Sequence, residues 1–398
     1  MIVAKKTFEL PEFRTLSGRT IERVRIGWES YGELNAEKSN AILVCHYFSG
    51  ASHAAGRYAE SDPLPGYWDA IIGSGKAIDT DKYFVFSSDT LVNINAFDPT
   101  VVTTGPASIN PATGKPYGLD FPLVTIGDFV RVQKALVDSL GIRKLRAVIG
   151  PSMGGLQTYE WAASYPDMME RIMPVIAAAK PGPWLIAWLN VWGTPVLVDP
   201  AWNGGDYYDK QPPTKGLAEA IKIIALHANH YQWTDATYGR AFAKEGVDPA
   251  DAIGNKFRVE AAFEEAGKAR AQFADANHLL YLIKANQTFI AGAGAGAKTA
   301  EEGLSRIKAP ALALYSPTDL VFPSAWVEAT IAALRKNGVR IEHAKLEGPN
   351  GHLNGLTAIG RQARRIAAFI DRDFSAGAPR RRRAAASDSG GDKRRRRS

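Results

Sequence analysis

The chain has 398 residues, of which 45% are hydrophobic and 22% are charged, so it is not a wholly disordered protein and can form a large core. Its single cysteine, Cys45, excludes a disulfide scaffold and a cysteine-based structural zinc site. No apolar run approaches the ~18 residues that a membrane span needs, and the N-terminus does not resemble a signal peptide. We therefore expect a cytoplasmic protein.

The net charge of +7 is concentrated at the C-terminus. Pro379–Ser398 holds nine of the 48 Lys and Arg residues and two of the 41 acidic residues, so the rest of the chain carries 39 of each sign. A segment rich in Arg, Ala, Ser and Gly cannot bury a core, and we expect a disordered basic tail at 374–398. Because the body is neutral, we expect no nucleic-acid partner and no membrane association.

Apolar runs alternate with helical patterns along most of the chain. In chain order, the expected elements are strands at 20–32, 41–45 and 82–87, a helix at 126–140, a strand at 145–149, a helix at 153–164, strands at 171–178 and 311–315, a helix at 324–334, a strand at 340–346 and a helix at 356–370. Thr125 and Asp128 fit a capping box for the first helix, and Gly141 provides its stop. This alternation predicts an α/β fold with a mainly parallel sheet and helices on both faces.

The alternation ends between about residues 180 and 305, where tryptophans lie among helical segments at 216–228 and 257–274. We expect a helical cap at 180–305, inserted into a core made of 1–179 and 306–373. The run AGAGAGA at 291–297 does not follow a strand, so we interpret it as a flexible return to the core and not as a dinucleotide-binding turn.

Residues 150–154 read Gly-Pro-Ser-Met-Gly, a G-x-S-x-G sequence directly between an expected strand and an expected helix. This is the context of a nucleophile elbow, which makes Ser152 the candidate nucleophile. An ordinary glycine-containing turn is the alternative, because glycine and serine are common in turns.

A serine nucleophile needs a base to take its proton. In folds with a nucleophile elbow, an acidic residue and then a histidine follow the serine along the chain. Asp319 and His352 each lie just after an expected strand, in that order. His352 would act as general base and later as general acid, and Asp319 would hold its tautomer. A turn-capping aspartate and an ordinary loop histidine are the alternatives for these two positions.

Acyl transfer also needs donors for the developing oxyanion. The candidates are the backbone N–H groups of Met153, next to the serine, and of Phe48, in the loop after the strand at 41–45. No metal site is expected, because His227 and His230 have no carboxylate or cysteine neighbour that completes a ligand set. Cys45 ends a buried strand and is interpreted as a core residue.

Several segments together resemble the homoserine O-acetyltransferase family of α/β-hydrolase-fold enzymes, over about residues 8–372. They are HYFSGASH at 46–53, the stretch Thr103–Thr125, GPSMGGLQTYEWAASYPD at 150–167, DPAWNGGDYY at 199–208 and TDLVFP at 318–323. The resemblance implies a serine–histidine–aspartate acyltransferase with a helical cap, often a homodimer through that cap. Ser152, Asp319 and His352 fall on the family's triad, and Phe48 and Met153 fall on its oxyanion hole.

Two positions depart from the family's pattern. An aspartate follows the catalytic histidine in the family and handles the substrate amino group, whereas this chain has Leu353. A cap-helix arginine holds the substrate carboxylate, whereas this chain has Ile221. Leaving a substrate charge unpaired in a buried site costs several kcal/mol. We therefore expect a substrate pocket at Ile221 and Leu353 that does not suit homoserine.

The sequence thus predicts a serine-dependent acyl-transfer enzyme that works through an acyl-serine intermediate. We expect an ester hydrolase or acyltransferase whose small-molecule ester or acyl donor is relatively apolar. No cofactor is expected, with acetyl-CoA or another acyl-CoA as an alternative co-substrate. Two other functions stay open: a homoserine O-acetyltransferase that uses acetyl-CoA, and a non-catalytic binding protein on the hydrolase fold.

Overall fold

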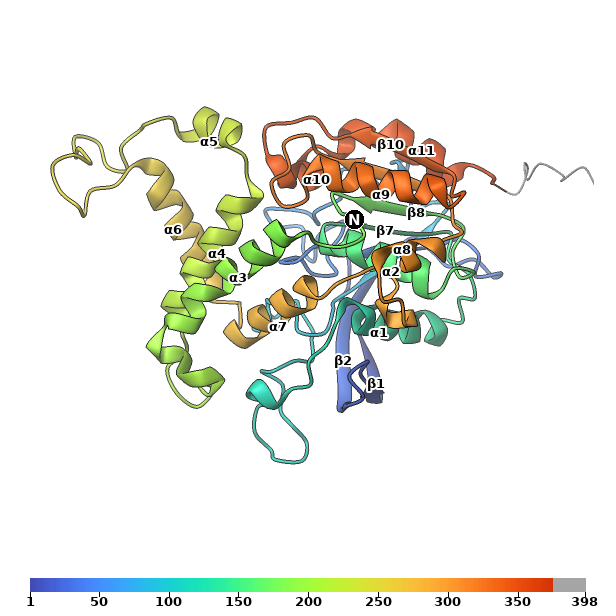
Figure 1. The fold of residues 1–398 in the computed structure, drawn as a ribbon, viewed down its shortest axis with the longest axis horizontal. Helices are drawn as coiled ribbons and strands as arrows, with labels where there is room; N and C mark the ends of the chain where they lie inside the picture. Colours follow the sequence, from blue (N-terminus) through green and yellow to red (C-terminus); the bar gives the residue numbers. More distant parts are fainter. Residues whose placement is uncertain (375–398) are drawn as a thin grey trace, which may run out of the picture.

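The computed structural model of the chain describes residues 1–374 (Figure 1). Within them, eight strands form one sheet in the order β1-β2-β6-β3-β7-β8-β9-β10. The strands are β1 Lys6–Arg14, β2 Thr20–Tyr31, β3 Ala41–Cys45, β6 Phe84–Ser88, β7 Ala147–Pro151, β8 Ile172–Val175, β9 Ala311–Tyr315 and β10 Ile341–Lys345, with a separate pair of β4 Ile72–Gly73 and β5 Ile78–Asp79. Pairing is parallel from β6 to β10 and antiparallel for β1 and β2.

The central strands are buried along their whole length, as expected where helices cover both faces of a parallel sheet. Alternate side chains of β3 join two different cores. Leu43 and Cys45 pack with residues of α1 (Ile126–Ser139), α2 (Met153–Ser164) and α9 (Ser324–Lys336). Ile42 and Val44 pack on the other face with residues of α11 (Ala363–Asp371). The predicted α/β-hydrolase architecture, a mainly parallel sheet with helices on both faces, is therefore confirmed.

The start of α1 follows the predicted capping box. The Thr125 hydroxyl accepts a hydrogen bond from the Asp128 N–H at 3.3 Å, and the Asp128 carboxylate accepts one from the Thr125 N–H at 2.9 Å. Gly141 follows the helix with a φ of +71°, a conformation that favours glycine. Local sequence chemistry therefore decides both ends of this helix.

Two elements differ from the sequence-based expectation. The expected helix at 356–370 is broken into α10 (Asn354–Thr357), a 3-10 turn and α11. Gly360 lies in the interruption, and glycine weakens a helix interior. The edge strand β1 was not expected, because it is largely exposed and contains Pro11, so its sequence lacks the signal of a buried strand.

Helices α3 to α7 lie to one side of the sheet domain, on the left in Figure 1, and we call them the cap helices. They are α3 Pro183–Val198, α4 Thr214–Ala228, α5 Tyr231–Tyr238, α6 Arg258–Ala271 and α7 Ala276–Gln287. Helix α4 packs between α3 and α6, and α7 packs on α3. The expected helices at 216–228 and 257–274 correspond to α4 and α6.

The glycine–alanine run at 291–297 connects α7 to α8 (Ala300–Ser305) and is anchored on α2. The buried Glu160 side chain accepts hydrogen bonds from the Gly292 N–H at 2.7 Å and the Gly294 N–H at 2.9 Å. The run thus leads from the cap helices back to α8, as expected, and a distant carboxylate accepts hydrogen bonds from two of its N–H groups.

Among the described residues, no helix is both long enough and apolar enough to cross a membrane. The expected basic tail lies outside the described residues, apart from its first residue. That residue, Phe374, packs edge-on against Phe369 of α11 with 5.5 Å between ring centroids.

Candidate active site

The turn between β7 and α2 places Ser152 at the carboxyl edge of the sheet. Ser152 has a φ of 56° and a ψ of −121°, a strained conformation for a residue with a side chain. A Cβ atom on Gly150 would lie 2.6 Å from the carbonyl oxygen of Cys45, and one on Gly154 would overlap the same oxygen. The two glycines of the G-x-S-x-G sequence are therefore required by the close approach of β3.

His352 and Asp319 reach this serine from the ends of two other strands. His352 lies in a 3-10 turn (Gly351–Leu353) after β10, and Asp319 lies in the loop after β9. The His352 Nε2 atom is 2.8 Å from the Ser152 Oγ atom, and its Nδ1 atom is 2.8 Å from the Asp319 Oδ2 atom. The structure thus brings together three side chains that the sequence keeps far apart.

The carboxylate of Asp319 is itself held in place. Its Oδ1 atom accepts hydrogen bonds from the backbone N–H groups of Val321 at 2.8 Å and Phe322 at 2.9 Å. Its Oδ2 atom remains for His352, so the Nδ1 atom of that ring is the donor and the Nε2 atom can accept the serine proton. This arrangement is able to convert a hydroxyl into a nucleophile.

The two backbone N–H groups proposed from the sequence as oxyanion donors belong to residues at this site. Met153 is the first residue of α2, where backbone N–H groups have no intrahelical acceptor and the helix dipole favours negative charge. Phe48 lies in the loop after β3 and lines the same cavity as Ser152. Within residues 1–374, neither N–H donates a hydrogen bond to another group, so both are available to an oxyanion.

A network that the sequence analysis missed supports the loop that carries Phe48. The Asn93 side chain donates to the Gly50 carbonyl at 2.9 Å, and the Asn95 side chain donates to the Ser49 carbonyl at 3.2 Å. The buried carboxylate of Asp89 accepts the Ser52 N–H at 2.7 Å. Side chains from the segment after β6 therefore hold the loop along its length.

The buried carboxylate of Glu29 on β2 anchors the end of this loop. It accepts hydrogen bonds from the Ser52 hydroxyl at 3.2 Å, the Tyr58 hydroxyl at 2.6 Å and the His53 ring at 2.9 Å, and lies 2.8 Å from the Lys5 Nζ atom. Burial by itself would raise the pKa of Glu29, but the hydrogen bond from His53 and the charge of Lys5 outweigh it and lower the pKa to about 2. No local motif joins these scattered positions, so the sequence carries no signal of the network.

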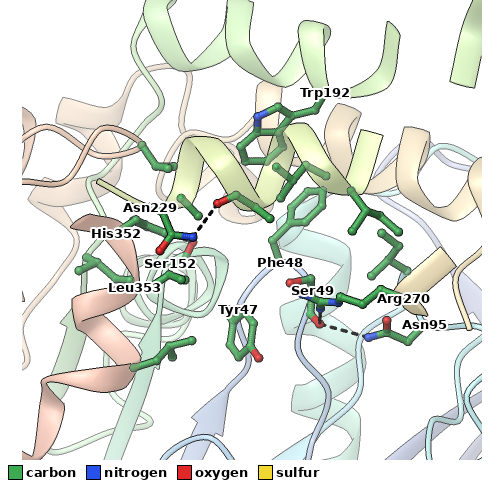
Figure 2. A pocket seen from close by; sticks show the side chains of 18 residues that line it. Tyr47, Phe48, Ser49, Asn95, Ser152, Trp192, Asn229, Arg270, His352 and Leu353 are labelled. Carbon is green, nitrogen blue, oxygen red and sulfur yellow. Dashed lines mark hydrogen bonds between the residues drawn. The ribbon is translucent and has the colours of Figure 1, made fainter. Parts of the chain in front are cut away.

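A cavity of about 290 Å³ opens beside Ser152 and His352, between the sheet and the cap helices (Figure 2). Its wall is mostly apolar and includes both residues that the sequence analysis assigned to the substrate pocket. The apolar lining residues are Phe48, Ile94, Ile176, Trp192, Ile221, Ile224, Ala225, Ala228, Val321, Leu353 and Leu356. Among residues 1–374, no carboxylate lines this cavity, and its one formally charged lining side chain is Arg270.

A second, much smaller hollow of about 20 Å³ also touches Ser152. Its wall includes Leu189, Trp192 and Phe322 and is otherwise almost entirely apolar. A space of this size holds about one water molecule or a group of similar size. The serine thus stands between a large cavity and a hollow for a very small group.

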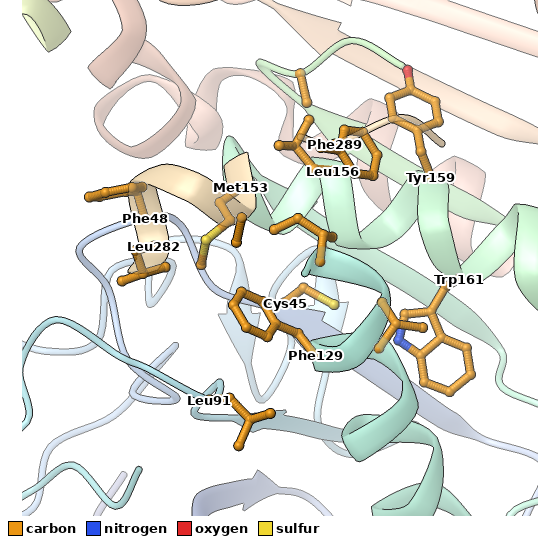
Figure 3. Packing of buried hydrophobic residues seen from close by; sticks show 14 of the residues in the cluster. Cys45, Phe48, Leu91, Phe129, Met153, Leu156, Tyr159, Trp161, Leu282 and Phe289 are labelled. Carbon is orange, nitrogen blue, oxygen red and sulfur yellow. The ribbon is translucent and has the colours of Figure 1, made fainter. Parts of the chain in front are cut away.

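The packing under the nucleophile turn explains why Cys45 is not a competing nucleophile (Figure 3). Cys45 is fully buried in the core with Phe129 and Leu156, and burial raises the pKa of its thiol far above the usual range.

The ring of His227, which the sequence analysis considered as a metal ligand, stacks on Trp188 with 4.3 Å between ring centroids. Among the described residues, no cluster of three or more His, Cys, Asp or Glu side chains could hold a metal ion.

Comparison with known proteins places these features in a family. Residues 73–345 match the family model described as alpha/beta hydrolase fold. The chain is 41% identical over 338 residues to a homoserine O-acetyltransferase of Symbiobacterium thermophilum, covering 84% of this chain and 86% of that protein.

Two solved structures are similar over nearly the whole chain. Esterase E22 has 47% sequence identity and a TM-score of 0.88, covering 93% of this chain and all of that chain. The homoserine O-acetyltransferase of Bacillus anthracis has 37% identity and a TM-score of 0.88, covering 94% of this chain and 99% of that chain.

Proposed function

The chain belongs to the homoserine O-acetyltransferase family of α/β-hydrolase-fold acyl-transfer enzymes, and on that premise we propose that Ser152 is its nucleophile. The single observation that carries this assignment is the pair of 2.8 Å contacts that link Ser152 to His352 and His352 to Asp319. The strained backbone of Ser152 supports it, because it presents the hydroxyl at the edge of the sheet.

In the proposed first half-reaction, the Ser152 oxygen attacks the acyl carbon while the His352 Nε2 atom takes the serine proton. The oxyanion accepts hydrogen bonds from the N–H groups of Phe48 and Met153, each worth about 3 kcal/mol in the transition state. The carbon–oxygen bond to the leaving alcohol then breaks, and His352 returns its proton to that alcohol. Asp319 stabilises the imidazolium throughout.

In the second half-reaction an acceptor attacks the acyl-serine while His352 removes its proton, and the free serine is restored. We infer that the acceptor is water, so that the enzyme is an ester hydrolase. The apolar lining at Ile221 and Leu353 and the lack of a lining carboxylate within residues 1–374 support this choice, because a homoserine ammonium group would lose its hydration without gaining a partner. Esterase E22 is a similar protein whose name supports the same activity.

The acyl group would occupy the small hollow and the alcohol portion the large cavity. A hollow of about 20 Å³ suits the methyl group of an acetyl ester and excludes a longer chain unless side chains move. We therefore propose small-molecule acetyl esters as substrates. No resident cofactor takes part in this scheme, although acetyl-CoA would be an alternative donor.

The second candidate function is homoserine O-acetyltransferase with acetyl-CoA as donor. The names of the curated relatives favour it, including the 41% identical protein of Symbiobacterium thermophilum. In this alternative the acyl-serine is the same, and the hydroxyl of homoserine replaces water as the acceptor. The charged groups of homoserine would then need partners outside the apolar wall.

The proposal is tested by comparing hydrolysis of p-nitrophenyl acetate and butyrate with acetylation of homoserine by acetyl-CoA, using equal amounts of enzyme. We expect hydrolysis of the acetyl ester to exceed both other rates, and expect Ser152→Ala to abolish it and to abolish labelling by a fluorophosphonate probe. Homoserine acetylation far above ester hydrolysis would establish the second candidate instead. Retention of hydrolysis in Ser152→Ala would overturn the assignment of the nucleophile.

Dimerisation through the cap is a further part of the proposal. Helix α3 exposes several large apolar side chains that water does not solvate favourably. They are Trp184, Ile186, Val191, Leu197 and Val198. Sedimentation of the purified protein is expected to give twice the mass of the chain, and a monomer at micromolar concentration would contradict this part.

A further inference from the structure

The large cavity contains a cation that the proposed chemistry does not use. Arg270 projects from α6, and its Nη2 atom donates to the backbone carbonyl of Ser49 at 3.3 Å. Within residues 1–374, no carboxylate forms an ion pair with Arg270, although its guanidinium carries five donors and a permanent charge. This leaves most of its hydrogen-bonding capacity free at the cavity wall.

Arg270 lies away from the reacting atoms. Figure 2 shows Ser152 and His352 on one side of the cavity and Arg270, with Ser49 and Asn95, on the other. The hydrogen bond to Ser49 ties this cation to the same loop that carries Phe48. A substrate that spans the cavity would therefore meet Arg270 at the end far from its ester.

The wall of the cavity also includes Tyr47 and, beside Arg270, Asn95, whose hydroxyl and amide are neutral hydrogen-bonding groups. Burial raises the pKa of Tyr47, and the charge of Arg270 opposes that increase, so the positive field of Arg270 extends to this hydroxyl. Figure 2 shows Phe48 between the two ends, and the apolar lining also includes Ile94 and Ile224, which suit a hydrocarbon spacer. The cavity is thus mostly apolar and positive at one end.

We propose that this cavity selects esters whose alcohol portion ends in an anionic group, a carboxylate or a phosphate, that pairs with Arg270. This inference rests on the proposed ester hydrolysis and names the substrate class of the same site. A planar guanidinium pairs with both anions through parallel N–H donors. The preferred alcohol carries no ammonium group, because no lining carboxylate within residues 1–374 would pair with it.

The reaction is an ordinary hydrolysis: water adds across the ester and yields acetic acid and a hydroxy acid. The test uses two esters of equal chain length, 6-acetoxyhexanoate and hexyl acetate, and measures acid release at constant pH and ionic strength. The quantity compared is the ratio of kcat/KM for the anionic ester to that for the neutral ester. A loss of activity that affects both esters equally leaves this ratio unchanged.

In Arg270→Gln we expect this ratio to fall about threefold to fivefold, which is the size of effect that an exposed ion pair produces. The fall should come from a higher KM for the anionic ester and not from a lower kcat. Arg270→Lys should restore part of it, because the charge is kept and the planar fork is lost. Lys268→Gln is the matched control, since Lys268 is an exposed cation on the same helix outside the cavity lining, and its ratio should equal that of the unmodified enzyme.

A third substrate, acetyl-CoA, distinguishes a phosphate partner of Arg270 from a carboxylate partner. If Arg270→Gln raises the KM for acetyl-CoA and leaves that for 6-acetoxyhexanoate unchanged, the partner of Arg270 is a phosphate; the opposite result identifies a carboxylate. Equal ratios in Arg270→Gln and the unmodified enzyme, with no change for acetyl-CoA, would overturn the inference while the hydrolase proposal stands. Absence of hydrolysis of both esters by the unmodified enzyme would instead refute the hydrolase proposal.

Discussion

The buried carboxylate of Glu29 provides a quantitative test of how the loop around Phe48 is held. Replacement by glutamine keeps the size of the side chain and removes the charge that faces Lys5 and His53. The pKa of Glu29 is lowered from 4.5 to about 2 in the folded protein. Since one pKa unit corresponds to about 1.4 kcal/mol, the ionised form contributes about 3 kcal/mol to the free energy of unfolding at neutral pH.

The sign of the pH dependence follows from the direction of this shift. A carboxylate whose pKa is lower in the folded state stabilises the protein above its unfolded pKa and loses that contribution as the pH falls toward the folded pKa. Between pH 4.5 and pH 2, the contribution of Glu29 therefore decreases by about 1.4 kcal/mol per pH unit. Glu29→Gln has no such group to protonate.

The assay is urea unfolding of the unmodified protein and of Glu29→Gln, followed by tryptophan fluorescence at several pH values. We expect Glu29→Gln to be less stable by about 3 kcal/mol at pH 7 and this difference to narrow by about 1.4 kcal/mol at pH 3.5. The control is Glu9→Gln, whose partner Arg25 is exposed and whose ion pair is worth about 1 kcal/mol or less. A difference that stays constant between pH 7 and pH 3.5 would refute the reasoning.

Three further changes test the site. Asp319→Asn should lower kcat for acetyl ester hydrolysis by about 10⁴-fold without unfolding the protein, because the amide would favour the wrong histidine tautomer; a loss below tenfold would contradict that role. Gly154→Ala should destabilise the fold by about 3 kcal/mol in a thermal unfolding assay, because its Cβ atom would overlap the Cys45 carbonyl, whereas Gly254→Ala, with open space around it, should have little effect. Leu353→Asp should raise homoserine acetylation relative to hexyl acetate hydrolysis by adding a carboxylate to the cavity wall, and an unchanged ratio would contradict the assigned position of Leu353 in the pocket.

Features that depend on neighbouring residues could be predicted from the sequence. The capping box at Thr125 and the limits of α2 follow from local chemistry that a few adjacent side chains contain. The turn at Ser152 is equally local, and the rule that ligands meet at the carboxyl ends of parallel strands extends it to Asp319 and His352. These residues could be predicted because the succession of strands along the chain and the residue types in the turns can both be read from the sequence.

What the sequence by itself determined is thus the alternation of strands and helices and the residue types at the strand ends, because propensity, periodicity and turn chemistry act over a few residues. Only the tertiary structure decided which distant groups touch. It placed Glu29 against Lys5 and His53, and it set Arg270 across the cavity from Ser152. Such contacts join positions whose spacing along the chain carries no information, because packing of the whole molecule determines them.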